Sequence, residues 1–487
     1  MSEPSKKPGA GLSAFFGGYI GFVVLGSALQ ALFWMALILI NPFGISSAAD
    51  RVSESIFLKF YAFAYPSFTH ASARDQILVV LYDEKTGLPK EGEWPLPRST
   101  HAELIRRILD MQPRAVFLDI LFDTQKGGDR SQTSAMLDAA RGARARTKPT
   151  APVFFASYAE DDTHKLVDLI AALPVTRTGT KVLPGQAYRA PVEYTALTNH
   201  YPLTDTHKEN GALTAAAALY NAYKPGPFDK KLAPLHPGED DMLVAWGAAL
   251  PSKHGRDAKA FPGCLHYFED SSDRWHGIGY ALGTAIFGRF PDQDFGWDKL
   301  QPCAYHQMVS AADFFDTKPA REAELERLVE GSYVLIGARV AGIGDEIVSP
   351  VNGKLPGVYL HAMALDNLLS FNAKPIVFSS AYMPIQTVLI FLALVCGRLL
   401  YERRILPKTR PGAALALAER LGVIALFAIL SALFLFVMLI EWHWPPYNWG
   451  AVFAVSTTEV LAGTGRLFLI LVAGAAGARW GEHAPAN

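Results

Sequence analysis

QILVVLYDE, residues 76–84, is an unbroken apolar run that ends in two acids. It does not alternate between apolar and polar residues, as a strand with one exposed face does. A short unbroken run of this kind is typical of a strand that is buried on both faces, which occurs mainly in parallel sheets covered by helices. The segment therefore predicts the centre of an α/β domain.

The next segment, WPLPRSTHAELIRRILDM (residues 94–111), has the pattern of an amphipathic helix. Its two prolines favour an extended approach to the helix. Ser99 or Thr100 is the expected N-cap, and Glu103 completes a capping box. These signals predict a helix that starts directly after the prolines.

Strands and helices continue to alternate along the chain. RAVFLDILFD (114–123) and APVFFASY (151–158) have the pattern of buried strands, and SQTSAMLDAARGARA (131–145) between them that of a helix. Later, REAELERLVEGSYVLIGARV (321–340) predicts a helix followed by a strand, and GVYLHAMALDNLLSF (357–371) predicts a helix. This order indicates right-handed crossovers and a parallel sheet.

The middle of this region does not continue the alternation of strands and helices. Residues 190–320 are rich in Pro, Gly and His and show little periodicity, so we expect further sheet elements and a surface insertion there. The predicted fold over residues 41–380 is an α/β domain with a mostly parallel, doubly wound-like sheet, helices on both faces and an irregular insertion.

Apolar segments near both ends of the chain predict a membrane region. Half of the 487 residues are apolar, and the excess is concentrated in four blocks. Residues 17–40 carry no charge and are long enough for an uncleaved signal anchor, whereas the apolar part of a cleaved signal peptide is shorter. Residues 381–400, 421–440 and 450–478 are three further predicted spans. We therefore expect an α-helical membrane region of four spans.

Positively charged residues predict the side of the membrane on which each loop lies. The segments 1–16, 401–420 and 479–487 carry Lys or Arg, whereas the tryptophan-rich loop 441–449 carries neither. By the positive-inside rule, both termini and the basic loop are cytoplasmic, and residues 41–380 lie outside. The net charge of −1 excludes a strongly basic, nucleic-acid-binding protein, and leaves membrane lipid as an expected partner.

Two of the three cysteines, Cys264 and Cys303, lie in the predicted outer domain. In an oxidising compartment they are candidates for a disulfide bond. Such a bond would contribute about 4 kcal/mol in the chain-entropy model. The alternative is a pair of buried free thiols. No spacing of Cys and His matches a structural zinc site, so we expect neither a metal nor a cofactor.

Four segments, taken in order, resemble the CHASE domain of type 2, an extracytoplasmic sensory module of bacterial receptors. They are ILVVLYDE, WPLPRSTHAELIRRIL, AVFLDILFD and GSYVLIGARVAGIGDEIVSPVNGKLPGVYLHAMALDNLL. The resemblance covers most of residues 50–380, and one span before the domain and three after it fit the family's layout. It implies a multi-pass protein of the bacterial inner membrane with a periplasmic domain. Family members usually continue into a kinase or nucleotide-cyclase domain, whereas only RWGEHAPAN follows the last predicted span, so we expect that effector to be lacking.

Polar residues are expected to gather at the carboxyl edge of the sheet, where α/β proteins bind ligands. Acids and an arginine beside helix starts suit a polar or charged small molecule. The alternative is a structural role, in which Asp119 caps a neighbouring backbone group or pairs with Arg98. The candidates are Asp83, Glu84, Arg98, Asp119, Asp123, Arg339, Asp345 and His361.

Catalysis is not predicted. Asp119 and Asp123 are four residues apart, which on a strand separates their carboxylates by about 13 Å, too far for a glycosidase pair. The sequence contains no GxSxG, HExxH or P-loop motif. We therefore expect a protein without catalytic residues.

The last predicted span carries two charged residues, Glu459 and Arg466. Each would cost about 2.5–3.5 kcal/mol at the centre of a bilayer. They share one helix face, so we expect them to make an interhelical contact, either within the chain or with a partner protein.

Two functions are compatible with these patterns. The first is a sensor or transducer subunit, whose outer domain detects a signal and passes it to a separately encoded effector. The second is a structural subunit of an oligomeric membrane assembly, in which the sensory fold is reused without a small ligand. In both cases we expect a homo-oligomer.

Overall fold

The computed structural model of the protein divides into two compact units, one formed by Ile56–Val377 and the other by Met1–Ser55 together with Phe378–Asn487. The residues that it describes are 19–40, 54, 58, 61–62, 65, 71–84, 88, 93–123, 130–142, 150–158, 166–192, 199–205, 211–222, 235, 241–247, 305–316, 318–340, 345–350, 353–374, 376, 384–385, 387–388, 391–392 and 395.

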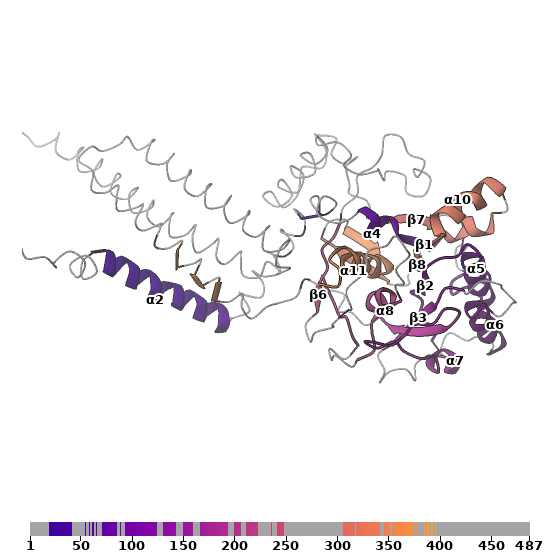
Figure 1. The fold of residues 1–487 in the computed structure, drawn as a ribbon, viewed down its shortest axis with the longest axis horizontal. Helices are drawn as coiled ribbons and strands as arrows, with labels where there is room; N and C mark the ends of the chain where they lie inside the picture. Colours follow the sequence, from indigo (N-terminus) through magenta and orange to yellow (C-terminus); the bar gives the residue numbers. More distant parts are fainter. Residues whose placement is uncertain are drawn as a thin grey trace, which may run out of the picture. The chain divides into compact units, whose positions relative to one another are not determined.

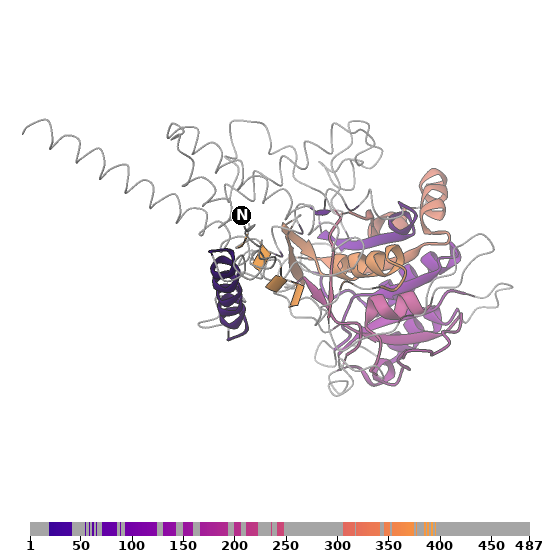
Figure 2. The ribbon, with the colours of Figure 1, turned by 60° about the vertical axis from the view of Figure 1, so that its left-hand side comes forward.

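The larger unit is built on a six-stranded sheet in which every neighbouring pair of strands is parallel (Figure 1; Figure 2). The strand order is β4-β3-β2-β8-β1-β7, so β8 lies between the first two strands of the chain. This confirms the predicted mostly parallel sheet. The strands are β1 (Ile77–Asp83), β2 (Ala115–Leu118), β3 (Val153–Ser157), β4 (Ala187–Pro191), β7 (Gln307–Ser310) and β8 (Tyr333–Arg339).

Helices cover both faces of this sheet, because successive residues of a strand point to opposite sides. On β1, Leu78, Val80 and Tyr82 belong to the core that α5 (Arg98–Asp110) and α6 (Arg130–Ala140) cover. We call this side the α5 face. The helices α7 (Asp168–Ala171), η6 (Ala311–Phe315) and α10 (Pro319–Val329) contribute to the same core.

The opposite side, which we call the α11 face, is covered by α11 (Val358–Ser370) and α8 (Ala215–Asn221). The short helix α4 (Ala71–Asp75) also contacts α11. α11 is buried around its whole circumference, from Val358 to Leu369. A helix of this kind lies inside a protein and not on its surface, so α11 is the central helix of the unit.

The predicted capping box at the start of α5 is wrong. The N-cap residue is Pro97, and no side chain caps the helix. Because the helix starts directly after this proline, Ser99 and Thr100 already lie in its first turn and do not reach the cap position. Glu103 instead pairs with Arg107 one turn further along the same helix.

The irregular middle region contributes short elements, as expected. β5 (His200–Tyr201) and β6 (Met242–Leu243) form an antiparallel pair, and β7 adds an edge strand to the main sheet. After β8, a second antiparallel pair consists of β9 (Glu346–Ser349) and β10 (Gly353–Pro356). Of these elements, only β7 belongs to the main sheet, and the two antiparallel pairs are separate from it.

Gly337 in β8 allows α11 to lie directly on the sheet. A Cβ atom at this position would be 2.6 Å from both Cβ and Cγ1 of Val358, the first residue of α11. We expect Gly337→Ala to destabilise the domain by about 1–3 kcal/mol, because the helix must move away from the strand. Thermal melting of the purified full chain measures this effect. In a Val358→Gly background, which removes the clashing atoms, the same substitution should have a smaller effect; equal effects in both backgrounds would contradict the prediction.

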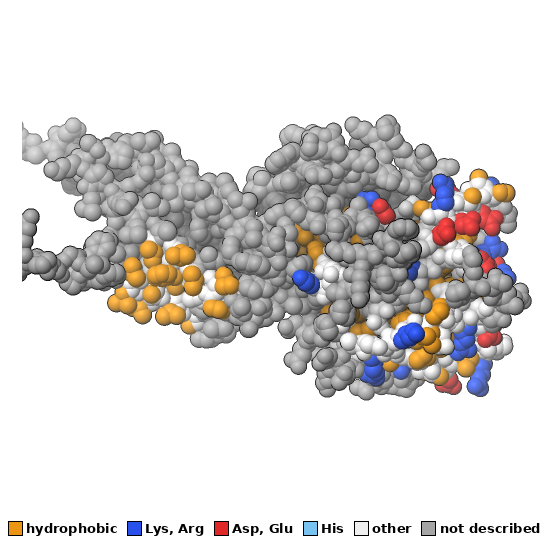
Figure 3. Space-filling model, viewed as in Figure 1, with side chains coloured by type: hydrophobic (Ala, Val, Ile, Leu, Met, Phe, Trp, Pro, Cys, Tyr) orange, Lys and Arg blue, Asp and Glu red, His pale blue; other side chains and the backbone are white. Residues whose placement is uncertain are grey.

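The described part of the smaller unit contains α2 (Tyr19–Ile40). Leu25, Leu29 and Leu32 follow one another at helical spacing and are exposed, whereas Ser27 is buried. Figure 3 shows hydrophobic side chains gathered on the surface of this part of the chain. Among the residues that the structure describes, no helix has the length and hydropathy needed to cross a membrane.

Several predictions fall on residues outside the described part of the chain, and they stay predictions. They concern the spans 421–440 and 450–478, most of the span 381–400, the charged pair Glu459 and Arg466, and the disulfide between Cys264 and Cys303.

Candidate functional site

Two of the predicted site residues form an ion pair at the ends of neighbouring strands. Asp83 is the last residue of β1 and Arg339 the last residue of β8, and the two are register partners. The Arg339 guanidinium donates a hydrogen bond to Asp83 Oδ2. Asp83 is buried, whereas Arg339 is partly exposed. The pair therefore joins the two central strands at the carboxyl edge of the sheet.

Asp119, the first residue after β2, lies beside His361 of α11. Its Oδ1 atom is 3.6 Å from His361 Nε2. On the other side of the histidine ring, Nδ1 is 2.8 Å from the hydroxyl of Tyr201, which accepts a hydrogen bond of 3.0 Å from the amide of Ala216. The ring also packs edge-on against Phe117. These contacts fix the orientation of a fully buried histidine at the carboxyl edge.

The direction of the hydrogen bonds in this group follows from its burial. Burial raises the pKa of Tyr201 well above its usual value, so the hydroxyl keeps its hydrogen and donates it to His361 Nδ1. The other ring nitrogen, Nε2, lies on the side of Asp119. The second carboxylate oxygen, Asp119 Oδ2, is buried and has no hydrogen-bond partner in the described part of the chain.

Asp119→Ala is expected to lower the free energy of unfolding by about 1–3 kcal/mol, because the buried His361 loses the carboxylate that faces it. Denaturant unfolding of the full chain measures the change. Asp119→Asn keeps an oxygen in the same place and should be milder. If Asp119→Ala melts like the wild type, the carboxylate has no structural role, and binding of a ligand becomes its better explanation.

Arg98 lies on the α5 face, and its predicted pairing with Asp119 is wrong. It is the first residue of α5, is 6% exposed, and donates a hydrogen bond from Nη1 to the Thr133 hydroxyl in the first turn of α6. Asp119 follows Phe117 by two residues and shares its side of the sheet, the side of His361. The strand register thus directs the two charged side chains to opposite faces.

His101, one turn further along α5 than Arg98, is buried among aromatic side chains. Its Nδ1 is 2.9 Å from the Tyr82 hydroxyl. Its ring packs edge-on against Tyr82, Phe122 and Trp94, with centroids 5.1, 5.4 and 6.3 Å away. Burial and, after it, the nearby charge of Arg98 lower the pKa of His101 to about 4. The histidine is therefore neutral at neutral pH.

The remaining candidates are Glu84, Asp123 and Asp345, of which Glu84 and Asp345 lie next to strand ends. Glu84 directly follows β1, the backbone of Asp123 pairs with Leu166, and the carbonyl of Asp345 accepts a hydrogen bond of 3.1 Å from the amide of Gly357. The contacts therefore divide the predicted cluster. The Asp83–Arg339 and Asp119–His361 pairs lie on the α11 face, and Arg98 lies on the α5 face.

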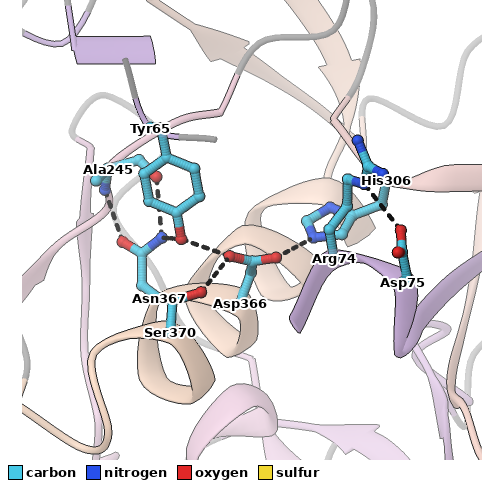
Figure 4. A network of polar contacts seen from close by, with 8 residues as sticks. All are labelled: Tyr65, Arg74, Asp75, Ala245, His306, Asp366, Asn367 and Ser370. Carbon is cyan, nitrogen blue, oxygen red and sulfur yellow. Dashed lines mark hydrogen bonds and ion pairs between the residues drawn. The ribbon is translucent and has the colours of Figure 1, made fainter. Parts of the chain in front are cut away.

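A second polar group lies near the amino ends of the strands, and the sequence did not predict it (Figure 4). Its centre is Asp366 of α11, which is 1% exposed. One carboxylate oxygen accepts hydrogen bonds from the hydroxyls of Tyr65 and Ser370, and the other is 3.1 Å from Nε2 of the buried His306. Burial and the charge of Asp366 raise the pKa of Tyr65, so this hydroxyl stays a donor.

The neighbouring residue, Asn367, extends this group to the insertion (Figure 4). Its Oδ1 accepts a hydrogen bond of 2.7 Å from the amide of Ala245, and its Nδ2 donates bonds of 2.9 Å to the Ala245 carbonyl and to Tyr65 Oη. We call Tyr65, His306, Asp366 and Asn367 the buried network. The adjacent polar pair Asp366–Asn367 inside a mostly apolar helix was the one signal in the sequence that indicated it.

The fold and its edges define the class of protein: a doubly wound α/β domain whose carboxyl edge carries charged side chains on both faces. Among the described residues, no group of three or more His, Cys, Asp or Glu side chains is placed to hold a metal ion.

The family model of the CHASE2 domain matches residues 34–399, more than half of the chain. The protein belongs to the CHASE2 domain family. CHASE2 is an extracytoplasmic sensory domain, and a domain of this kind implies a membrane protein. No curated protein and no solved structure matches the chain.

Proposed function

We propose that the protein is an integral membrane sensor whose CHASE2 domain controls a separately encoded partner. Membership of the family supports the sensory role. The apolar segments 17–40, 381–400, 421–440 and 450–478 support four spans, and the distribution of Lys and Arg favours cytoplasmic termini. On this proposal the protein lies in a bacterial inner membrane, with residues 41–380 in the periplasm.

The observation that carries the proposal is the position of α11. Its first turn holds His361 next to Asp119, at the carboxyl edge where α/β domains bind ligands. Its last turns hold Asp366 and Asn367, which bind Tyr65. Tyr65 lies near the beginning of the larger unit and α11 near its end. A ligand that displaces α11 would therefore act on both chain segments that lead to the predicted spans.

A buried network of several hydrogen bonds can couple α11 to the Tyr65 segment, because its members do not move independently without leaving polar groups unpaired. Asp366 accepts from three side chains, and Asn367 holds the backbone of Ala245 at both its amide and its carbonyl. We infer that a shift of α11 carries the Tyr65 segment with it.

The topology is tested by cysteine labelling in whole cells. Ser2→Cys and Ser252→Cys place one thiol on each predicted side of the membrane. A membrane-impermeant maleimide should label the second site and not the first. Equal labelling or equal protection at the two sites would contradict the proposed orientation.

The partner is tested by purification from native membranes in mild detergent. We expect an oligomer that retains a second protein with a cytoplasmic output domain. Replacing both Glu459 and Arg466 with leucine should reduce recovery of that protein or change the oligomer, because the two charges no longer hold the last span against its neighbour. A large homo-oligomer that retains no other protein would favour the structural role instead.

A further inference from the structure

We propose that Asp119 binds a small primary ammonium compound at the carboxyl edge of the sheet, through its oxygen Oδ2. The inference deepens the sensory function proposed above, because it names the chemical class of the ligand. It rests on that function only for the biological role of the ligand, since binding itself is a property of the folded domain.

The first observation is a buried carboxylate oxygen that has no partner. The Asp119 side chain is 9% exposed, and no group in the described part of the chain forms a hydrogen bond with Oδ2. The other oxygen, Oδ1, is 3.6 Å from His361 Nε2, which is longer than a hydrogen bond. Arg339 of the neighbouring strand β8 donates to Asp83. A buried carboxylate normally has a donor beside it, because its desolvation is otherwise unfavourable.

The second observation is the place of Asp119 in the topology of the sheet. β8 lies between β1 and β2. The chain after β1 leads to α5 and the chain after β2 leads to α6, both on the α5 face, whereas the chain after β8 leads through β9 and β10 to α11 on the opposite face. Open α/β sheets bind their ligands at such a switch point, outside the carboxyl ends of the strands. Asp119 is the first residue after β2, which pairs with β8, and therefore lies at this point.

The third observation is that Oδ2 lies behind a short segment without regular structure. The backbone of Asp119 is held by a hydrogen bond of 2.8 Å from its amide to the Ile336 carbonyl. The next residues, 120–122, belong to neither a helix nor a strand, and Ile120 and Leu121 are partly exposed. A small ligand therefore reaches Oδ2 when this segment moves, while the strands stay paired.

The chemistry of the site favours an ammonium group over other cations. Asp83 and Arg339 form an ion pair on the same face, so the charge of Asp119 is left for a monovalent cation. Oδ1 faces His361, and the single remaining oxygen suits an ammonium better than the two-pronged guanidinium. A metal ion would need several further ligands, and no group of three or more His, Cys, Asp or Glu side chains in the described ranges is placed to supply them.

A ligand at Asp119 would act on the helix that the proposed transfer uses. His361 belongs to the first turn of α11, and its ring lies between the Asp119 carboxylate and the Tyr201 hydroxyl. An ammonium group that shifts the carboxylate changes the surroundings of this buried ring. The site therefore adjoins α11 directly, without an intervening element.

The test uses the purified full chain with propylammonium chloride as the probe, at pH 8 in an amine-free buffer of constant ionic strength. Calorimetry measures the affinity, and thermal melting measures the stabilisation. The comparison probes are 1-propanol, which lacks the charge, and tetramethylammonium chloride, which lacks N–H donors. We expect propylammonium to raise the melting temperature, because it supplies both the charge and the donor, and we expect no effect of the comparison probes.

Two variants that remove the same charge locate the site. Asp119→Asn keeps an oxygen beside His361, whereas Asp110→Asn changes an exposed aspartate at the end of α5 and is the matched control. Propylammonium should bind at least about tenfold more weakly to Asp119→Asn and with unchanged affinity to Asp110→Asn. Hydrogen exchange of the wild type locates the site without a substitution: the probe should slow exchange at residues 119–123 and leave α10 unchanged.

Several results would overturn the proposal. They are no stabilisation of the folded wild type by propylammonium, an equal effect of tetramethylammonium or 1-propanol, equal losses in the two variants, and wild-type affinity in Asp119→Asn. Unchanged exchange at residues 119–123 with the probe bound would also overturn it, even if Asp119→Asn does not fold. Each of these results leaves the topology and partner experiments unaffected, so the sensory function would stand or fall separately.

Discussion

Asp366→Ala is expected to lower the free energy of unfolding of the larger unit by about 3–5 kcal/mol, the usual effect of removing one member of a buried, charged group. The substitution leaves the hydroxyl of Tyr65 and Nε2 of His306 without their acceptor in the interior. Neither group reaches water, because His306 and Tyr65 are buried. Thermal and denaturant unfolding of the purified full chain measure the loss.

Two control variants define what this loss means. Ser370→Ala removes one of the three donors to Asp366 and should destabilise by about 1 kcal/mol. Asp316→Ala removes a partly exposed aspartate outside the network, which pairs with Lys318, and should lower the melting temperature much less than Asp366→Ala does. A similar, small effect of all three substitutions would show that the network does not hold the ends of the unit together. Sensing would then need another route to the predicted spans.

Lowering the pH from 6.5 to 4 should destabilise the domain by about 3 kcal/mol through His101 alone. Burial lowers the pKa of this histidine from its usual value of 6.5 to about 4. Between these two values the unfolded chain binds a proton that the folded chain does not, so stability rises with pH. The contribution of His101 to the free energy of unfolding is complete above about pH 6.5 and is lost as the pH falls towards 4.

His101→Gln isolates this contribution, because glutamine does not titrate and still offers Tyr82 a hydrogen-bond partner. Denaturant unfolding of wild type and variant is measured at several pH values between 4 and 7. The difference between the two stability curves should change by about 3 kcal/mol over this window, in favour of the wild type at high pH. Parallel curves would show that His101 is accessible to protons in the folded domain.

Local sequence patterns predicted the elements of the fold that depend on local physics. The runs that became β1, β2, β3 and β8 are unbroken and apolar because both faces of these strands are buried. The edge strand β7 was not predicted individually, because its four residues lie in a region without periodicity. The start of α5 was misplaced because Pro97 acts as N-cap in place of Ser99 or Thr100.

The sequence predicted where the charged residues of the candidate site lie, but it did not predict which of them form pairs. The sequence indicated that Asp83 and Asp119 lie at the ends of strands and Arg98 at the start of a helix. It also indicated that these ends meet at one edge of the sheet. It did not indicate which acid meets which base. Strand register pairs Asp83 with Arg339, and the alternation of side chains separates Asp119 from Arg98.

The sequence by itself therefore determined the class of the fold, the order of its main elements and the resemblance to the CHASE2 family, because apolar periodicity is a local property that each segment expresses alone. Only the tertiary structure decided the buried network and the contact of Arg98 with Thr133 in place of Asp119. Tyr65 and Asp366 are 301 residues apart in the chain, and Arg98 and Thr133 are 35 residues apart. Such contacts arise from the way helices pack on the two faces of the sheet, and no window of sequence contains both partners.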